Sequence, residues 1–180
     1  VVDCNRDLSD LTAFPEQSAG EPVPGNVSLN NVGRKRRAVE IYWPYHHEID
    51  RQIAELEKNS PAPAIISIHS FTPDFAGEIR PWHIGVLWDK DDRIARPFMD
   101  KLSTRDGILV GDNEPYSGRH LADFTIDHHA EANGLPHLAI EIRQDLIATP
   151  EGVAHWAALI ADVLEEIIGG RKLYSRLNLG

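Results

Sequence analysis

The chain alternates short apolar runs with longer segments in which apolar residues recur at helical spacing. The runs expected to form strands are 65–68, 82–88, 108–110 and 138–143. The segments expected to form helices are 44–59, 94–102, 120–132 and 150–168. Strands that alternate with helices favour a largely parallel sheet with helices packed on its faces. We therefore predict an α/β fold, a three-layer α/β/α sandwich around a mixed, largely parallel sheet.

The length of 180 residues corresponds to one domain, which we expect to span residues 1–180. Residues 7–33 are rich in Pro, Gly, Asn and Ser and lack periodicity, so we expect a long irregular excursion there. The chain opens without methionine on Val1, Val2 and Asp3, which resemble the end of a strand. We therefore expect a domain that is truncated at its N-terminus.

The charge balance and the single cysteine disfavour several classes of protein. The 18 basic and 28 acidic residues give a net charge of -10, which disfavours nonspecific binding to nucleic acid. The one basic cluster, Arg34 to Arg37, is more typical of a solvated helix face or of an anchor for a local anion. Cys4 alone cannot form an intramolecular disulfide and fits a reducing compartment. Because no apolar run reaches the roughly 18 to 20 residues of a membrane span and no signal peptide is recognisable, we expect a cytoplasmic protein without a membrane partner.

Polar side chains lie on or just after the expected strands, where ligands bind in open α/β sheets. His69 follows the first expected strand, and Glu141 lies within the otherwise apolar last one. In an extended strand Ser67 shares a face with His69, and Glu141 shares a face with Arg143. Burying an ionised carboxylate without a partner is costly, so Glu141 is more typical of a cleft than of a dry core. His69 and Glu141 are therefore our starting hypothesis for an active site.

Residues of these types suit hydrolysis at a metal. A neutral histidine can donate to zinc, and a carboxylate that does not bind the metal can take the proton of the attacking water. Arginine suits an anionic substrate because its planar fork pairs with a carboxylate through two parallel hydrogen bonds. Further polar candidates at strand ends are Asn5, Arg6, Asn113 and Glu114.

Several short motifs occur together in a characteristic order. They are Asp3–Arg6, Pro24–Asn26, Pro44–His46, Ser67–Pro73, Arg80–Gly85, Gly111–Ser117, Gly134–His137 and Glu141–Ile147. Taken together they extend over nearly the whole chain, and the chain resembles the N-formylglutamate amidohydrolase family. That family is similar in fold to the zinc carboxypeptidases and aspartoacylase. The resemblance thus implies a zinc carboxypeptidase-like sandwich.

The resemblance also implies roles for single residues. Asn5 and Arg6 correspond to the pair that grips the substrate carboxylate, His69 to one zinc ligand, and Glu141 to the general base. Further residues in matching motifs are expected in the substrate pocket: Arg80, Glu114, Tyr116 and Arg143. The remaining zinc ligands are expected upstream of Val1. The implied reaction is zinc-dependent hydrolysis of the N-acyl amide of a small anionic amino acid such as N-formylglutamate; the sequence does not indicate an oligomeric state.

Other interpretations of the two central residues stay open. His69 can be a hydrogen-bonded core histidine, and Glu141 can be a structural ion-pair partner of Arg143 or Arg6. A catalytic zinc ion normally has about three protein ligands, which His69 cannot supply alone. The alternative function is therefore a noncatalytic chain that retains an anion pocket without holding a metal.

The remaining histidines carry weaker signals. The run Asp127-His128-His129 mimics a phosphoesterase signature, and His128 with Glu131 has the spacing of a metal pair on a helix. No supporting set of strand-end aspartates accompanies them, so we expect solvent-facing or helix-packing roles. Of the other histidines we expect only His83 to lie near the pocket.

Overall fold

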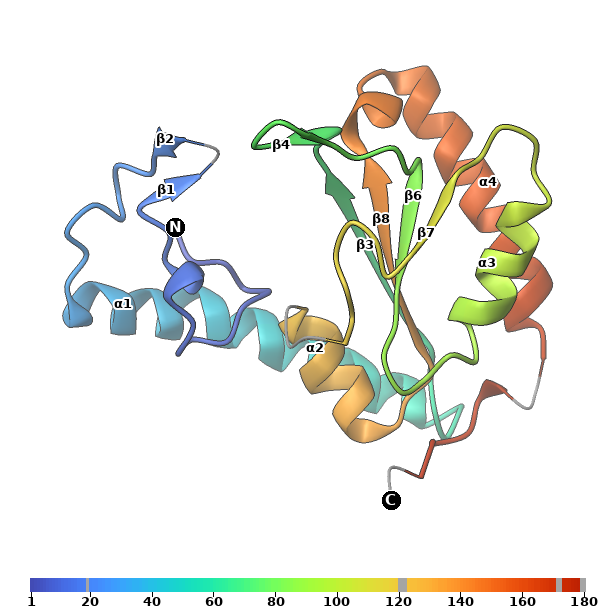
Figure 1. Cartoon of the computed structure of the whole chain (residues 1–180). Helices are drawn as coiled ribbons and strands as arrows, with labels where there is room; N and C mark the ends of the chain where they lie inside the picture. The colour runs from blue at the N-terminus through green and yellow to red at the C-terminus, as the bar shows by residue number, and fades with distance from the viewer. Residues whose placement is uncertain (19, 120–122, 171–172, 179–180) are drawn as a thin grey trace.

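The structure is a computed structural model that describes residues 1–18, 20–119, 123–170 and 173–178. Its centre is a four-stranded sheet in the order β3-β8-β6-β7 (Figure 1). These strands span Ile65–Phe71 (β3), His137–Arg143 (β8), Ile84–Leu87 (β6) and Val110–Asp112 (β7). The β3/β8 and β6/β7 pairs are parallel, whereas β6 runs antiparallel to β8. The predicted α/β fold with a mixed, mostly parallel sheet is confirmed.

Two helices cover one face of this sheet, α3 (Ala95–Ser103) and α4 (Pro150–Ile168). Their apolar faces and alternate sheet residues form the main core: Ile84, Val86, Phe98, Leu102, Leu138, Ile140, Ile142, Trp156, Ile160 and Val163. The ends of α4 agree with the predicted 150–168, because Thr149 caps the helix by accepting from Gly152 N and Gly169 follows its last residue.

Sheet residues that alternate with these core residues point to the opposite face of the sheet. Leu87 of β6 and Ala139 of β8 pack with Ile126 and Ala130 of the helical segment η3 (Ile126–Ala130). Ile53 of the long helix α2 (Trp43–Glu57) joins the same cluster. Helices therefore lie on both faces of the sheet, and the helices of this second face lie toward one end of it (Figure 1).

The predicted helix over 120–132 is helical from Phe124 onward and continues into η4 (Glu131–Asn133). Residues 120–122 lie outside the described part of the chain. A short helical turn, η5 (Gln144–Ile147), follows β8, and a small hairpin, β4 (Asp74–Phe75) with β5 (Glu78–Ile79), follows β3. None of the described helices is long and apolar enough to cross a membrane.

The helix predicted over 44–59 begins earlier than expected. It runs on from α1 (Asn31–Arg37) through η2 (Ala38–Tyr42) into α2, and its N-terminal part projects away from the sheet (Figure 1). Asn30 caps it by accepting from Gly33 N. No residue of α1 is buried, so α1 has no apolar face that a periodicity argument could detect.

Residues 1–30 fold against this projecting helix. Val2, Ala13, Phe14 and Tyr42 form their small core, and the segment includes η1 (Leu11–Ala13), β1 (Gln17–Ser18) and β2 (Glu21–Pro22). The prediction that Val1–Asp3 ends a strand is wrong, because these residues form no strand. The 7–33 excursion is thus a folded segment attached by its own core.

The basic cluster helps to hold this segment. The Arg34 guanidinium lies 4.9 Å from the centre of the Phe14 ring, and Arg37 donates to Val1 O at 3.1 Å and also to Gly25 O. Arg36 pairs with Glu40 at 3.0 Å. Arg34 and Arg37 therefore contact the N-terminal segment, whereas the Arg36 side chain is 74% exposed and lies on a solvated helix face, as expected from the sequence.

The paired residues Ile140 and Ile68 test where the core lies, because they are register partners in β8 and β3 but are 0% and 59% exposed. We expect Ile140→Ala to lower the free energy of unfolding by about 2 to 5 kcal/mol, since it leaves a cavity among α3, α4 and the sheet. Ile68→Ala should cost less than about 1 kcal/mol. Urea unfolding of both variants measures this, and equal losses would contradict the described packing.

Candidate active site

The register of β3 and β8 brings the two central candidates together. In this parallel pair His69 lies opposite Glu141, and Gly85 of β6 lies opposite Glu141 on its other side. Because side chains alternate along a strand, Glu141 points to the same face as Ala139, which is the face covered at one end by η3. His69 and Glu141 therefore lie on neighbouring strands at the uncovered part of this face.

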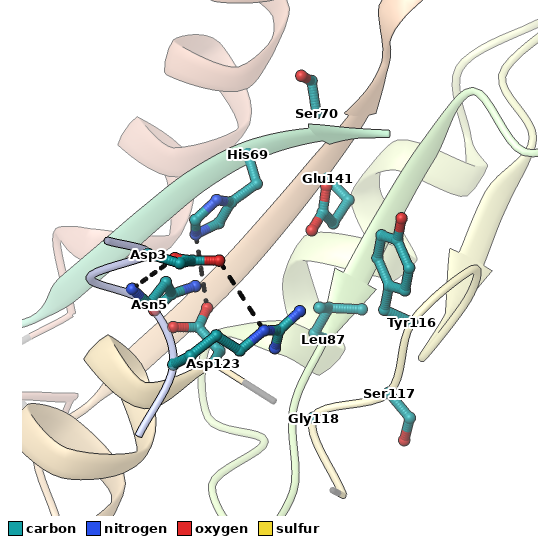
Figure 2. Close-up of a pocket in the computed structure, with 11 residues that line it drawn as sticks. Asp3, Asn5, His69, Ser70, Leu87, Tyr116, Ser117, Gly118, Asp123 and Glu141 are labelled. Atoms are coloured by element: carbon teal, nitrogen blue, oxygen red, sulfur yellow. Dashed lines mark hydrogen bonds and ion pairs between the residues drawn. The ribbon is translucent and has the colours of Figure 1, made fainter. Parts of the chain in front are cut away.

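A cavity of about 340 Å³ opens there (Figure 2). Its walls are formed by Asp3, Asn5, Arg6, His69, Ser70, Leu87, Tyr116, Ser117, Gly118, Asp123 and Glu141. Five of the residues proposed from the sequence thus line one cavity, namely Asn5, Arg6, His69, Tyr116 and Glu141. They come from the N-terminal loop, two strands and the loop after β7, which are far apart in sequence.

Two glycines let the loop after β7 cross the sheet. A Cβ on Gly85 would overlap the carbonyl oxygen of Glu114, and a Cβ on Gly111 would lie 2.6 Å from the same atom. The Asn113 amide oxygen then accepts from Trp88 N at 3.2 Å and from Gly118 N at 2.9 Å, which fixes the loop. This close approach brings Tyr116, Ser117 and Gly118 to the wall of the cavity.

Glu141 is the most strongly perturbed group in the cavity. It is 8% exposed, and no hydrogen-bond partner is described for its Oε2 atom. Burial and, to a smaller extent, the charge of Asp123 raise the pKa of Glu141 to about 7, although Arg80 and Arg6 act in the opposite direction. The carboxyl group therefore exchanges a proton near neutral pH, which is the property of a general base or acid.

His69 faces two partners on this side of the sheet. Its Nε2 atom lies 2.8 Å from Ser67 Oγ and 3.6 Å from Asp123 Oδ2. Asp123 is itself held in place, because its Oδ1 atom accepts from Ile126 N at 3.1 Å at the start of the helix. His69 is thus a half-exposed, hydrogen-bonded wall residue beside a carboxylate.

Asp123 and Asp3 are wall residues that sequence reasoning missed as functional candidates. Asp123 has a local signal, because an Asp just before the apolar residues of an expected helix is typical of an N-cap. Its distance from His69 depends on how η3 packs against β3, for which the sequence carries no local sign. Asp3 belongs to a motif already noted, and its Oδ2 atom lies 4.0 Å from Arg6 Nε.

The Asn5–Arg6 pair reaches the cavity through contacts with the same helix. Asn5 Oδ1 accepts from Thr125 N at 2.9 Å, and Asn5 O accepts from Phe124 N at 3.2 Å. Asn5 N in turn donates to Asp3 Oδ1 at 2.8 Å. Asn5 therefore links the N-terminal loop to the start of the helix while it lines the cavity.

Arg80 borders the cavity without being part of its wall. Its Nη1 atom donates to Tyr116 Oη at 3.0 Å, and its guanidinium lies between the rings of Tyr116 and Phe75, 4.9 and 4.8 Å from their centres. Its positive charge still reaches Glu141, as the opposing effect on the Glu141 pKa indicates. Arg80 is therefore placed to contribute charge at the mouth of the cavity.

Glu114 and Arg143 lie outside the cavity wall. Glu114 is exposed and approaches the sheet with its backbone. Arg143 pairs with Asp145 at 2.7 Å and donates to Pro81 O at 3.0 Å. Their predicted substrate-binding roles stay predictions, and Arg143 already has a structural role in fastening two loops.

The other histidines divide as follows. His128 is exposed, with its ring 5.0 Å from that of Phe124. His129 is buried between His46 and Asp50. His83 accepts from Leu109 N at 2.9 Å and does not line the cavity, although we expected it near the pocket.

Comparisons with known proteins bear on the family and the fold of the chain. A model of the N-formylglutamate amidohydrolase family matches residues 1–148. A gene product of Agrobacterium tumefaciens with a crystal structure is 32% identical and matches over 93% of this chain and 66% of its own, with a TM-score of 0.86. An N-formylglutamate amidohydrolase from Ralstonia eutropha is 17% identical over 79% of this chain and 56% of its own, with a TM-score of 0.51, and this likeness shows the fold alone. No curated protein matches the chain. The chain thus spans less than two thirds of either solved relative.

The buried carboxyl group of Glu141 has a measurable effect on stability. Its pKa of about 7 exceeds the ordinary 4.5, so the unfolded chain releases its proton first and stability falls as pH rises between these values. We expect Glu141→Gln to be more stable than the unchanged chain by about 1 to 3 kcal/mol at pH 8, and by less than about 0.5 kcal/mol at pH 4. Urea unfolding at both pH values measures this difference.

Glu151→Gln on the exposed first turn of α4 is the matched control, and it should be no more stable than the unchanged chain at pH 8, because a negative charge near a helix N-terminus is favourable. If Glu141→Gln and the unchanged chain were equally stable at pH 8, Glu141 would not carry a raised pKa in the folded chain.

Proposed function

The chain belongs to the N-formylglutamate amidohydrolase family, and from this premise we propose that it hydrolyses the N-acyl amide of a small acidic amino acid such as N-formylglutamate. The name of the matching family supports an amide hydrolase. Because the chain covers only part of its solved relatives, the activity of a whole relative enters here as a proposal.

The observation that carries the proposal is the buried Oε2 atom of Glu141, which has no described partner and belongs to a cavity that Arg6 also lines. A base works best when its pKa lies near the operating pH, and the pKa of Glu141 is about 7. A carboxyl group stabilised only structurally would be expected to have its oxygens paired. Glu141 is therefore the residue to which we assign the proton transfers.

The proposed reaction conserves atoms and protons. Water adds to the acyl carbon while Glu141 takes one of its protons, and the proton then passes to the leaving nitrogen as the carbon–nitrogen bond breaks. With N-formylglutamate the products are formate and glutamate. Arg6 and Asn5 are the groups proposed to hold a substrate carboxylate, since charge-assisted hydrogen bonds to arginine suit that group.

Zinc is the metal that the resemblance implies, with His69 as one ligand. Among the residues that the structure describes, no group of three or more His, Cys, Asp or Glu side chains could hold a metal ion. His69 and Asp123, 3.6 Å apart, do not supply the roughly three protein ligands of a catalytic zinc site. The described residues alone therefore do not fit the metal, and we propose that its other ligands come from outside them.

A zinc carboxypeptidase-like arrangement of the sheet belongs to the same proposal. Its support is the glutamate on an inner strand beside a histidine near the end of the neighbouring strand, with an Asn-Arg pair facing both. The incomplete ligand set favours one second candidate function. In that case the chain binds a small anion at Arg6 without catalysing its hydrolysis.

Formate release from N-formylglutamate tests the proposed reaction. We expect turnover by the protein that carries this chain when zinc is supplied, and a loss of about 10²- to 10⁴-fold in kcat for Glu141→Gln, because a general base contributes about that much. Glu151→Gln, which is exposed on α4, should leave the rate unchanged. Full turnover by Glu141→Gln would remove Glu141 as the base.

Calorimetric titration with zinc tests the noncatalytic candidate. We expect residues 1–180 to bind zinc weakly, because the described part of the chain has no three His, Cys, Asp or Glu side chains grouped so as to hold a metal ion. A tight one-to-one isotherm that His69→Ala abolishes, and that the exposed His155→Ala retains, would overturn this expectation and the noncatalytic candidate together.

A further inference from the structure

A continuous line of hydrogen bonds runs beside the cavity. Asp50 Oδ1 lies 2.8 Å from His129 Nδ1, and His129 Nε2 lies 2.8 Å from His46 Nδ1. His46 Nε2 then lies 3.0 Å from the carbonyl oxygen of Cys4. The line, which we call the histidine chain, therefore ends on the residue directly before Asn5 and Arg6.

The histidine chain connects three separate parts of the fold. Asp50 and His46 lie one turn apart on α2, His129 lies on η3, and Cys4 lies in the N-terminal loop. Both rings are 1% exposed, whereas the Asp50 side chain is 59% exposed. The buried rings thus join the loop that carries Asn5 and Arg6 to a carboxylate at the surface.

The three hydrogen bonds of the histidine chain determine how many protons the two rings must carry. The Cys4 carbonyl and an ionised Asp50 carboxylate only accept, so His46 Nε2 and His129 Nδ1 must each carry a proton. The ring-to-ring bond needs one further proton on either of the two remaining nitrogens. The three bonds therefore use three ring protons, one more than two neutral imidazoles hold.

Other polar groups surround the pair. Tyr42 and Tyr45 of the long helix have ring centres 4.3 and 5.0 Å from that of His46, and the His128 ring centre lies 4.8 Å from that of His129. Burial lowers the pKa of both buried rings, and Asp50 opposes this at both of them. Asp50 is thus the charged group that favours retention of the extra proton.

We propose that His46 and His129 are positioning residues, which share one extra proton opposite Asp50 and hold the Cys4 carbonyl so that Asn5 and Arg6 face the cavity. The substrate-anchoring part of this inference rests on the proposed function of Arg6. With all three hydrogen bonds formed, the histidine chain holds one proton more than it does when the bond between the two rings is broken. Lowering the pH therefore favours it, and raising the pH removes the proton and with it one hydrogen bond.

Asp50→Asn is the most informative variant. Asp50 is exposed, so the change should be tolerated, and the amide oxygen of Asn can still accept from His129. It removes the opposite charge, so we expect the pH midpoint of the pair to fall by about 0.5 to 1 unit. Glu55→Gln removes an exposed charge from the same helix and should leave the midpoint unchanged. Side-chain ¹⁵N spectra of histidine between pH 5 and 8 measure the charge of the pair directly.

Backbone amide signals of Asn5 and Arg6 report positioning without any ligand. They should titrate with the same midpoint as the pair and follow it to lower pH in Asp50→Asn. Two neutral rings throughout this pH range would overturn the shared proton. Signals of Asn5 and Arg6 that do not change at the pH midpoint of the pair would overturn the positioning role.

Glutarate, a simple dicarboxylate, probes the link to function. At pH 6 its dissociation constant should rise by up to about 3- to 10-fold in Asp50→Asn, the factor that corresponds to the shift in midpoint, and it should be unchanged at pH 8. An unchanged constant at pH 6 would contradict the link. If the unchanged chain bound no glutarate, the anchoring role of Arg6 would fail while the two spectroscopic results still decided the positioning role.

Discussion

The parallel pairing of β3 with β8 is the constraint on which the site depends. It places His69 directly opposite Glu141, and a shift of the register by one residue would turn Glu141 into the core beside α3 and α4. The apolar residues on the other side of β8 hold the register, because Leu138, Ile140 and Ile142 must all remain buried there. The energy of the core thus maintains a carboxyl group in a position that would otherwise be unfavourable.

A second requirement is that the N-terminal loop reaches this face from a distance. Residues 1–30 have their own small core on the projecting helix, fastened by Arg34 and Arg37. Asn5 then bonds to the start of the helix at Phe124 and Thr125, the helix whose cap is Asp123. One helix start therefore orients both Asp123 beside His69 and the loop that carries Arg6.

Elements whose pattern reflects burial could be predicted from the sequence, and those held by distant partners could not. The last strand and α4 followed from apolar periodicity and end signals, and both agree within a residue or so. The start of the long helix at Asn31 was missed because α1 buries no residue and depends on the loop it carries. In the site, His69 and Glu141 were predicted from unusual residues on apolar strands, whereas the antiparallel direction of β6 and the approach of Asp123 to His69 depend on packing between remote segments.

The charges of the cavity link proton uptake at Glu141 to the anion binding that we propose at Arg6. Asp3, Asp123 and Glu141 place three carboxyl groups around one wall arginine, so an anion that binds at Arg6 meets a largely negative surface. Protonation of Glu141 removes one of these charges, and the anion in turn cancels the field by which Arg6 lowers the Glu141 pKa. Because such coupling is reciprocal, a bound anion raises the proton affinity of Glu141 to the same extent that the proton strengthens anion binding. In the proposed reaction, Glu141 is therefore a stronger base when an anion is bound at Arg6 than when none is bound.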